Sequence, residues 1–346
     1  MKDNPFTLMF GSSPILTIER PEEKYEIINT FQSEYMNNKV YLISSIRGSG
    51  KTVLMVDIAN YFKTQKDWIV IQLDPLTDMK SSLLSRLNSS CGAYLKTLNF
   101  NLSLFNIVTI GANLENKITD IDTAIIKVLE HLKSKNIKVL ITVDEVIKNE
   151  NMKLFTSMFQ MISGNDLPVF LLMTGLYENI KNLQDDKSLT FLYRSLKINL
   201  SPLNINAIAF KYKQVFSLDD IESLKMAKLT NGYAFAFQVL GYLTFKHNGN
   251  YKEVIDEYKL YLEEYSYDKI YSELSNKDKE ILYALSKTKS NKISELMESL
   301  NMDNNHFNPY RKRLINKGIV ISKERGKLSF VLPLFKEYIL NNYYEE

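Results

Sequence analysis

A glycine-rich segment followed by Lys-Thr contains the residue types best suited to phosphate chemistry. The segment 45–52, SIRGSGKT, follows a short apolar run at 40–43 and precedes an apolar helical pattern. Strand, glycine-rich turn, Lys-Thr and helix is the order of a P-loop, whose backbone N–H groups surround phosphate oxygens. Gly48 and Gly50 allow the backbone to curl tightly. The segment therefore predicts a binding site for a nucleotide phosphate.

The residue types assign a role to each position of this loop. Lys51 is expected to reach the β- and γ-phosphates, and the Thr52 hydroxyl to bind Mg²⁺. The positive end of the helix dipole favours the same anion. The other residues expected at the nucleotide are Arg47, Gly48, Ser49, Gly50 and Val53.

One position departs from the GxxxxGK[ST] pattern, because its first glycine is Ser45 here. Gly48 supplies a compensating flexible point. The alternative interpretation is a glycine-rich turn with a lysine by chance. An intact GSGKT after a buried strand disfavours that alternative.

Two adjacent acids end a second apolar strand. Residues 139–143 are almost entirely apolar and lead into Asp144 and Glu145. Continuous apolar strands suit a parallel sheet covered on both faces, and ligands bind at its carboxyl ends. Asp144 would hold the Mg²⁺ water shell, and Glu145 would orient or deprotonate the attacking water. Acids after strands also cap helices, but a position about ninety residues after the P-loop favours a Walker B motif.

A third buried strand, 167–174, ends in Thr174. This small polar side chain could touch the γ-phosphate or the attacking water, or it could cap the segment that follows. Further strands are expected at 67–73 and 197–200, and helices at 21–35, 81–98 and 121–135, whereas 102–112 is open between strand and loop. This β-α alternation predicts an α/β fold with a doubly wound parallel sheet.

Composition limits the class of protein. The chain has 346 residues, 45% hydrophobic and 24% charged, with a net charge of +3, so two or three globular domains are expected. One cysteine, Cys91, allows no internal disulfide, and three dispersed histidines suggest no zinc site. No apolar run approaches the ~20 residues of a membrane span. The start lacks a signal-peptide core, so a cytoplasmic protein without membrane partners is expected.

After residue 201 the pattern becomes helical. Ser217 with Asp220 indicates a capped helix start, 230–232 breaks that helix, and further helices are expected at 233–246 and 251–274. These elements predict a small helical domain at 201–270.

The last block, 271–346, predicts a winged helix. Helices are expected at 276–285 and 293–300, and a third runs to Lys317 from Asn308 as N-cap and Pro309 as first residue. Strands 319–322 and 328–331 would form a hairpin. Tyr310, Leu314 and Ile315 would face the core of this domain.

Positive charge gathers on the third helix and the hairpin. The block holds 13 Lys or Arg against 10 Asp or Glu, a difference of only +3. The candidate DNA contacts are Arg311, Lys312, Arg313 and Lys317 on the helix and Lys323, Arg325 and Lys327 on the wing. A winged helix that reads duplex DNA puts its third helix in the major groove and its wing on the backbone. A solvated basic face on a protein-binding winged helix is the alternative.

These motifs together resemble the AAA+/STAND-type P-loop ATPases of bacteria and archaea that end in a winged helix, relatives of the origin-recognition initiator ATPases. The resemblance covers nearly the whole chain. It is carried by NPFTLMFG near the start, Glu19-Arg20, RGSGKT, VDE, MTG, Arg194 in FLYRSLKINLSPL, and NGYAFAFQVLG. It implies an ATPase core at 1–200, a helical lid at 201–270 and a winged helix at 271–346.

The same resemblance implies further site residues. In the family, the loop before the P-loop and a glycine-proline helix clasp the adenosine, which implies Arg20 and Gly232 near the nucleotide. The family's proline is Ala234 here, and a lid arginine at the sensor-2 position is not evident. Arg194 resembles an arginine presented to the γ-phosphate of a neighbouring subunit, which implies a homo-oligomer. A surface arginine is the alternative.

The leading hypothesis is an ATPase that binds ATP with Mg²⁺ and hydrolyses it slowly to ADP. Its nucleotide state would make it a switch, loader or remodeller acting on double-stranded DNA or a protein. The alternative is a non-catalytic nucleotide-binding module whose winged helix binds a protein. A small-molecule kinase is disfavoured, because it gives the winged helix no role.

Overall fold

The computed structural model describes residues 3–8, 14–33, 38–90, 121–187 and 189–343. The chain divides into two compact units. The unit that we call the lid unit comprises Met1–Arg20, Ser44–Val53 and Asn199–Glu346, and the sheet unit comprises Pro21–Ile43 and Leu54–Ile198. The glycine-rich segment 45–52, which we call the phosphate loop, therefore belongs to the same unit as the helices after residue 199.

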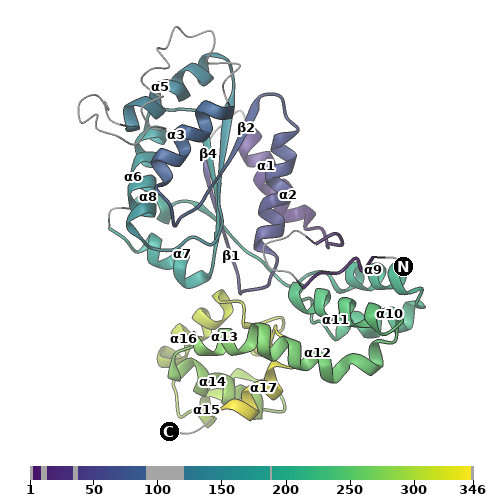
Figure 1. Cartoon of the computed structure of the whole chain (residues 1–346). Coiled ribbons are helices and arrows are strands. Elements are labelled where there is room, and N and C mark those ends of the chain that lie inside the picture. The colour runs from purple at the N-terminus through teal and green to yellow at the C-terminus, as the bar shows by residue number, and fades with distance from the viewer. Residues whose placement is uncertain (1–2, 9–13, 34–37, 91–120, 188, 344–346) are drawn as a thin grey trace, which may run out of the picture. The chain divides into compact units, whose positions relative to one another are not determined.

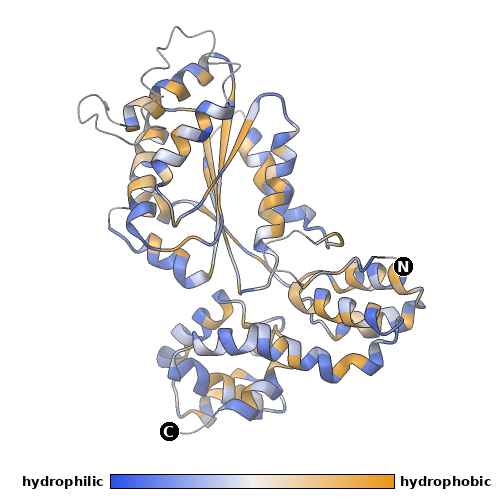
Figure 2. Ribbon diagram, viewed as in Figure 1, coloured by the Kyte–Doolittle hydropathy of each residue, from blue (hydrophilic) through white to orange (hydrophobic). Residues whose placement is uncertain are grey.

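A five-stranded sheet forms the centre of the sheet unit, in the order β2-β3-β4-β1-β5 (Figure 1). Its strands are β1 Val40–Ser44, β2 Trp68–Leu73, β3 Lys138–Val143, β4 Val169–Gly175 and β5 Leu196–Asn199. The register pairs Ile71 with Ile141 and Ile141 with Leu171 in parallel strands. Every residue of β1 and β4 is buried, and the strands are apolar along most of their length (Figure 2). The predicted parallel sheet is confirmed.

Helices cover both faces of this sheet. Helices α3 Met79–Ser90, α5 Ile121–Ser134 and α6 Glu150–Gly164 pack on one face through a cluster that includes Leu83, Leu129 and Phe155. Aromatic rings fill the other face, where Phe31 of α1 Pro21–Gln32 contacts Phe170 of β4. Helix α2 Lys51–Lys63 begins in the phosphate loop and continues on this second face (Figure 1). The short helices α7 Tyr177–Gln184 and α8 Thr190–Tyr193 complete the unit.

Two expectations for this unit change in detail. The helix expected at 81–98 begins earlier, at Met79, and is described only to Ser90. The rest of it, the 102–112 segment and Cys91 lie outside the described residues. The helix expected at 21–35 ends at Gln32; its Ile27, Ile28 and Phe31 are buried, whereas Tyr25 is 51% exposed.

A bundle of helices follows residue 199 in the lid unit. Its members are α9 Ile205–Phe216, α10 Asp220–Lys228, α11 Ala234–Lys246, the 3₁₀ turn η3 Tyr251–Val254, α12 Ile255–Leu262, the π-helical segment η4 Glu263–Tyr267 and α13 Asp268–Ser272. The helix expected at 251–274 is thus interrupted by a π segment. Phe6, from the start of the chain, is buried against Tyr212 and Phe237 of this bundle.

The predicted cap at Ser217 is wrong. Asp219 caps α10 by accepting a hydrogen bond from the Glu222 N–H at 2.8 Å. Ser217 instead ends α9 in the left-handed region, with φ of 54°. An N-cap needs an extended backbone, which Asp219 has and Ser217 lacks.

Three helices and a two-stranded hairpin follow, in the order of a winged helix. They are α14 Asn276–Lys287, α15 Ile293–Ser299, α16 Asn304–Asn316, β6 Val320–Ile321 and β7 Ser329–Phe330, with α17 Phe335–Asn342 last. The strands pair antiparallel, with Val320 opposite Phe330. Leu282, Leu314 and Phe335 are fully buried between these elements. Tyr310 and Ile315, expected in the core, are only half-buried.

Helix α16 begins earlier than the sequence suggests. Asp303 is its N-cap and accepts a hydrogen bond from the His306 N–H at 2.9 Å. Asn308 and Pro309 therefore lie inside the helix, and their expected capping roles are wrong. Pro309 lacks the N–H that would bond to the Asn305 carbonyl, and the Asp303 cap supports the turn before it. Among the described residues, no helix is both long and apolar enough to span a bilayer.

Candidate nucleotide site

The phosphate loop curls through two glycines with positive φ, Gly48 at 72° and Gly50 at 91°. Lys51 begins α2 and is only 9% exposed. Its ammonium nitrogen lies 3.2 Å from the Ser45 carbonyl oxygen and 2.8 Å from that of Ile46. The lysine charge is therefore held inside the curl of the loop, at the positive end of a helix.

A phosphate fits the donors of this loop. The Ser49 hydroxyl and the Arg47 Nε are buried and have no hydrogen-bond partner among the described residues. Leaving a buried donor unpaired costs about 1–3 kcal/mol, so an acceptor-rich group such as phosphate matches this position. Thr52 is exposed in the first turn of α2 and Val53 is half-buried. The Thr52 hydroxyl is an oxygen donor of the kind that Mg²⁺ prefers.

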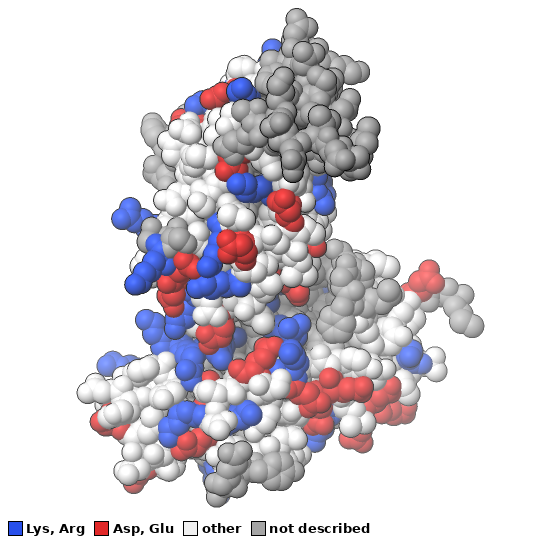
Figure 3. Space-filling model, turned by 60° about the vertical axis from the view of Figure 1, so that its left-hand side comes forward, with Lys and Arg blue, Asp and Glu red and all other residues white. Residues whose placement is uncertain are grey.

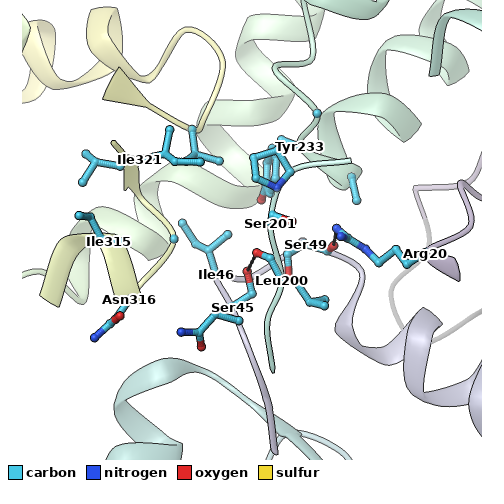
Figure 4. A pocket seen from close by; sticks show the side chains of 17 residues that line it. Arg20, Ser45, Ile46, Ser49, Leu200, Ser201, Tyr233, Ile315, Asn316 and Ile321 are labelled. Atoms are coloured by element: carbon cyan, nitrogen blue, oxygen red, sulfur yellow. Dashed lines mark hydrogen bonds between the residues drawn. The ribbon is translucent and has the colours of Figure 1, made fainter. Parts of the chain in front are cut away.

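A cavity of about 170 Å³ lies beside the loop within the lid unit. In Figure 4, Arg20 and Ser49 lie on one side of it, Ile315, Asn316 and Ile321 on the other, and Ser45 and Ile46 between them. The Arg20 guanidinium donates to the Ser49 carbonyl oxygen at 3.3 Å. Gly232 also lines this cavity. The structure thus brings together Arg20, Gly232 and the phosphate loop, which the resemblance implied at the nucleotide.

The first turn of lid helix α11 bonds to the loop directly. The Tyr233 hydroxyl donates to the Arg47 carbonyl oxygen at 2.8 Å, and the Phe235 N–H donates to the Gly48 carbonyl oxygen at 3.0 Å. Sequence reasoning missed Tyr233. The available signal was Gly48 itself, because that position is free in the P-loop pattern and need not be glycine.

The acidic pair lies in the sheet unit, after β3. Asp144 is half-buried, and its Oδ1 accepts hydrogen bonds from the Glu145 N–H at 2.9 Å and from the Thr174 hydroxyl of β4. Glu145 is exposed and has a φ of 49°. Left-handed backbone is uncommon for such a residue and often marks a functional position. Thr174 is fully buried and is joined to Asp144; Leu176, not Thr174, is the N-cap of α7.

Comparison with solved structures decides the fold. The chain is similar to the Walker-type ATPase PABY2304 of Pyrococcus abyssi, with 16% identity, a TM-score of 0.60, and coverage of 94% of this chain and 96% of that one. It is also similar to the ORC2 protein of Aeropyrum pernix, solved as ADPNP and ADP complexes, with 12% identity, a TM-score of 0.56, and coverage of 92% and 91%. The chain has the fold of these two proteins.

Two further comparisons add less. A family model described as a domain of unknown function (DUF8462) matches residues 264–339, which hold α14 to α16, the hairpin and most of α17. A search of the curated proteins finds no match to the sequence.

Arg194 lies on the surface of the sheet unit. It is exposed and forms the C-cap of the four-residue helix α8. Its neighbour Tyr193 is 69% exposed and is covered in part by the Lys197 ammonium, 5.2 Å from the ring centroid. Exposure leaves both an intersubunit role and a plain surface role open to Arg194.

The seven candidate DNA contacts of the winged-helix part fall into two groups, and those of the first group contact other side chains of the same part. Asp278 of α14 is fully buried and pairs with Arg313 at 2.6 Å and with Lys317 at 3.7 Å. Lys327 pairs with Glu324 at 2.7 Å. The Arg311 guanidinium lies 3.4 Å from the Ser322 hydroxyl and is half-buried.

The second group is exposed and comprises Lys312, Lys323 and Arg325. On the face shown in Figure 3, charged side chains of both signs are present, and much of the surface between them is uncharged. Positive charge available to a partner is therefore smaller than the sequence suggested.

Within the described part of the chain, no group of three or more His, Cys, Asp or Glu side chains could hold a metal. Mg²⁺ needs no such group, because it keeps several waters and is bound through one or two protein oxygens plus substrate phosphates.

Proposed function

We propose that this chain is a slow ATPase that binds Mg·ATP at the phosphate loop and uses the nucleotide state as a switch. The observation that carries the proposal is the loop itself. Its buried lysine, two positive-φ glycines and helix N-terminus match the charge and shape of a polyphosphate. The likeness to the ORC2 protein, described with ADPNP and ADP, supports an adenine nucleotide.

Hydrolysis requires residues of the sheet unit. When bound, Mg²⁺ neutralises charge on the β- and γ-phosphates. Thr52 and, directly or through water, Asp144 would hold the ion. Glu145 would orient the attacking water and accept its proton. Thr174 would keep the Asp144 carboxylate in one orientation, since its hydroxyl already donates to that group.

The γ-phosphate distinguishes ATP from ADP, and it is the group on which Glu145 would act. A ligand can shift a conformational equilibrium only by its different affinity for the two states. ATP and ADP would therefore favour different conformations of the chain, and loss of the γ-phosphate would be the switch.

The experiment is a titration of the full chain with ATP, ADP and GTP, with and without Mg²⁺, together with a phosphate-release assay. Micromolar binding of ATP and ADP, weaker binding of GTP, and slow phosphate release dependent on Mg²⁺ are expected. Absence of binding to any of these nucleotides would contradict the proposal. Binding without phosphate release would support the non-catalytic module instead.

We further propose double-stranded DNA as the partner of the winged-helix part. The exposed residues Lys312, Lys323 and Arg325 lie on the third helix and on the wing, the two elements that contact DNA in this fold. Their small number favours weak binding dominated by phosphate contacts, with a strong dependence on salt. A protein partner is the outcome if no DNA binding is found at low salt.

A further inference from the structure

Two successive carbonyl groups of the phosphate loop point toward the start of lid helix α11. The Tyr233 hydroxyl binds the first, that of Arg47, and the Phe235 N–H binds the second, that of Gly48. A Cβ atom on Gly48 would lie 2.5 Å from the Tyr233 hydroxyl oxygen and 3.0 Å from the Phe235 Cβ. The lid packs so closely on this part of the loop that only glycine fits there.

These two bonds also fix the direction of two N–H groups. A trans peptide is planar, so its C=O and N–H point in opposite directions. The Arg47 carbonyl shares a peptide with the Gly48 N–H, and the Gly48 carbonyl shares one with the Ser49 N–H. With both carbonyls held toward the lid, both N–H groups point away from it. Such fixed N–H groups are the donors that a P-loop offers to phosphate.

Tyr233 is itself held by a second residue. Its hydroxyl oxygen lies 2.7 Å from the Ser266 Oγ. Because the Arg47 carbonyl can only accept, the Tyr233 hydroxyl donates to it and must accept from Ser266. Both side chains are 2% exposed. Burial raises the pKa of Tyr233 above its ordinary value, so the hydroxyl keeps its proton at neutral pH.

Ser266 connects this contact to the end of the chain. It lies in the π-helical segment η4, and π segments are rare and frequent at functional sites. The next residue, Tyr267, donates its hydroxyl to the Pro333 carbonyl oxygen. The Tyr338 hydroxyl of α17 donates to Asp268 at 2.6 Å. Adjacent hydrogen-bonded residues thus lead from the phosphate loop to the C-terminal helix.

We propose that Tyr233 is a positioning residue of the nucleotide site. It presets the Gly48 and Ser49 N–H groups for phosphate and, through Ser266, ties the loop to the segment that carries the winged helix. The inference rests on the proposed nucleotide binding. Donors that are already ordered bind more tightly, because binding need not order them. By linkage, nucleotide in the loop strengthens the contact between loop and lid.

The test compares Tyr233→Phe with Tyr258→Phe. Tyr258 is also buried in the lid unit, but its hydroxyl donates to the Leu229 carbonyl at 3.0 Å instead of to the loop. Both variants should lose a similar amount of thermal stability. Only Tyr233→Phe should weaken Mg·ADP and Mg·ATPγS binding, by about 3- to 10-fold, the effect of one hydrogen bond.

Ser266→Ala provides a second variant that keeps Tyr233 in place. It should weaken nucleotide binding by about 2- to 3-fold, since it removes only the bond that orients the hydroxyl. The double variant Tyr233→Phe, Ser266→Ala should bind no more weakly than Tyr233→Phe alone, because the serine acts through the tyrosine. Additive losses would contradict the relay. If Tyr233→Phe does not fold, the single variant Ser266→Ala carries the test.

Hydrogen exchange of the nucleotide-free protein separates the inference from the proposed function. Exchange in residues 44–53 should rise in Tyr233→Phe and not in Tyr258→Phe. If the wild type binds nucleotide and the two variants match in affinity and exchange, the positioning role is wrong and the proposed function stands. If the wild type binds no nucleotide, the proposed function is wrong, and the positioning role fails with it.

Discussion

The phosphate loop and the acidic strand end belong to different compact units and are built in different ways. The loop offers backbone groups, and its shape depends on two positive-φ glycines and on bonds to the lid. The acidic end offers side chains, and strand pairing positions them, since Asp144 follows β3 and Thr174 lies on the adjacent β4. Binding is thus expected to depend on the lid unit, and hydrolysis on the sheet unit.

This difference predicts that the two activities can be separated by mutation. A change in the loop should remove binding and, with it, hydrolysis. At the acidic end, a change of Glu145 should leave nucleotide bound and stop its turnover, whereas a change of Asp144 should also remove the Mg²⁺-dependent part of the affinity. The following predictions test that division.

The largest effect is expected for Lys51→Ala. It removes the charge that meets the phosphates, and charge-assisted bonds are about twice as strong as neutral ones. ATP affinity should fall by about 100-fold or more in an equilibrium titration. Lys63→Ala, at the exposed other end of the same helix, is the matched control and should bind as the wild type does. Unchanged affinity in Lys51→Ala would show that the loop is not the nucleotide site.

Glu145→Gln should give the next largest effect, on turnover alone. Losing a positioned general base typically costs about 10²–10⁴-fold in rate, whereas nearby Asp144 and the loop are unchanged. Phosphate release should fall by about 100-fold with ATP affinity kept within about twofold of wild type. Glu150→Gln, in the first turn of α6, is the control. Equal turnover in the two variants would place catalysis elsewhere.

The winged-helix part allows the same kind of separation between structure and binding. Arg313→Ala removes the 2.6 Å partner of the buried Asp278 and leaves Lys317 at 3.7 Å, so it should cost up to about 3–5 kcal/mol of stability. Lys312→Ala removes an exposed charge and should leave the melting temperature unchanged. If DNA is the partner, Lys312→Ala should weaken binding and reduce the salt slope by about 0.9. Fluorescence anisotropy on random duplex DNA measures this.

Two results would contradict the proposal that the winged-helix part binds DNA. DNA affinity that is indifferent to Lys312 and Arg325, or no binding at low salt, would remove DNA as the partner. A protein partner would then be favoured.

The last prediction concerns Arg194→Ala, whose effect depends on whether subunits assemble. An arginine that acts across subunits should lower turnover and leave ATP affinity unchanged. A mixture of Arg194→Ala and Lys51→Ala proteins should recover part of the turnover, because one mixed site is complete. Lys197→Ala, on the same exposed surface, is the control. No recovery in the mixture would leave Arg194 as a surface residue.

Local patterns allowed the strands, the phosphate loop and the acidic pair to be predicted. The sheet strands are short apolar runs with turn signals, and the glycine-lysine motif needs eight consecutive residues. The wrong helix starts arose where the sequence offers two capping residues close together, such as Asp303 and Asn308. Geometry decided between them, because only Asp303 has the extended backbone of a cap.

The missed contacts join residues that are far apart in the sequence. Tyr233 meets Arg47 across 186 positions, and Asp278 meets Arg313 across 35. Neither pair has a local sequence pattern. From the sequence alone, a basic residue on a polar helix face that contacts solvent cannot be distinguished from one that pairs with a buried carboxylate. The domain division at 200 and 270 stays a prediction, because the compact units group residues 44–53 with the chain after 199.

The most direct measurement asks whether Asp144 contributes to binding the Mg²⁺ that accompanies ATP. ATP affinity would be measured with Mg²⁺ and with EDTA in wild type, Asp144→Asn and the exposed control Asp185→Asn. Removing a metal-orienting carboxylate costs about 10–100-fold in metal affinity. Wild type and Asp185→Asn should therefore bind ATP about 10-fold more tightly with Mg²⁺, and Asp144→Asn should bind equally with and without it. A full Mg²⁺ effect in Asp144→Asn would contradict the account.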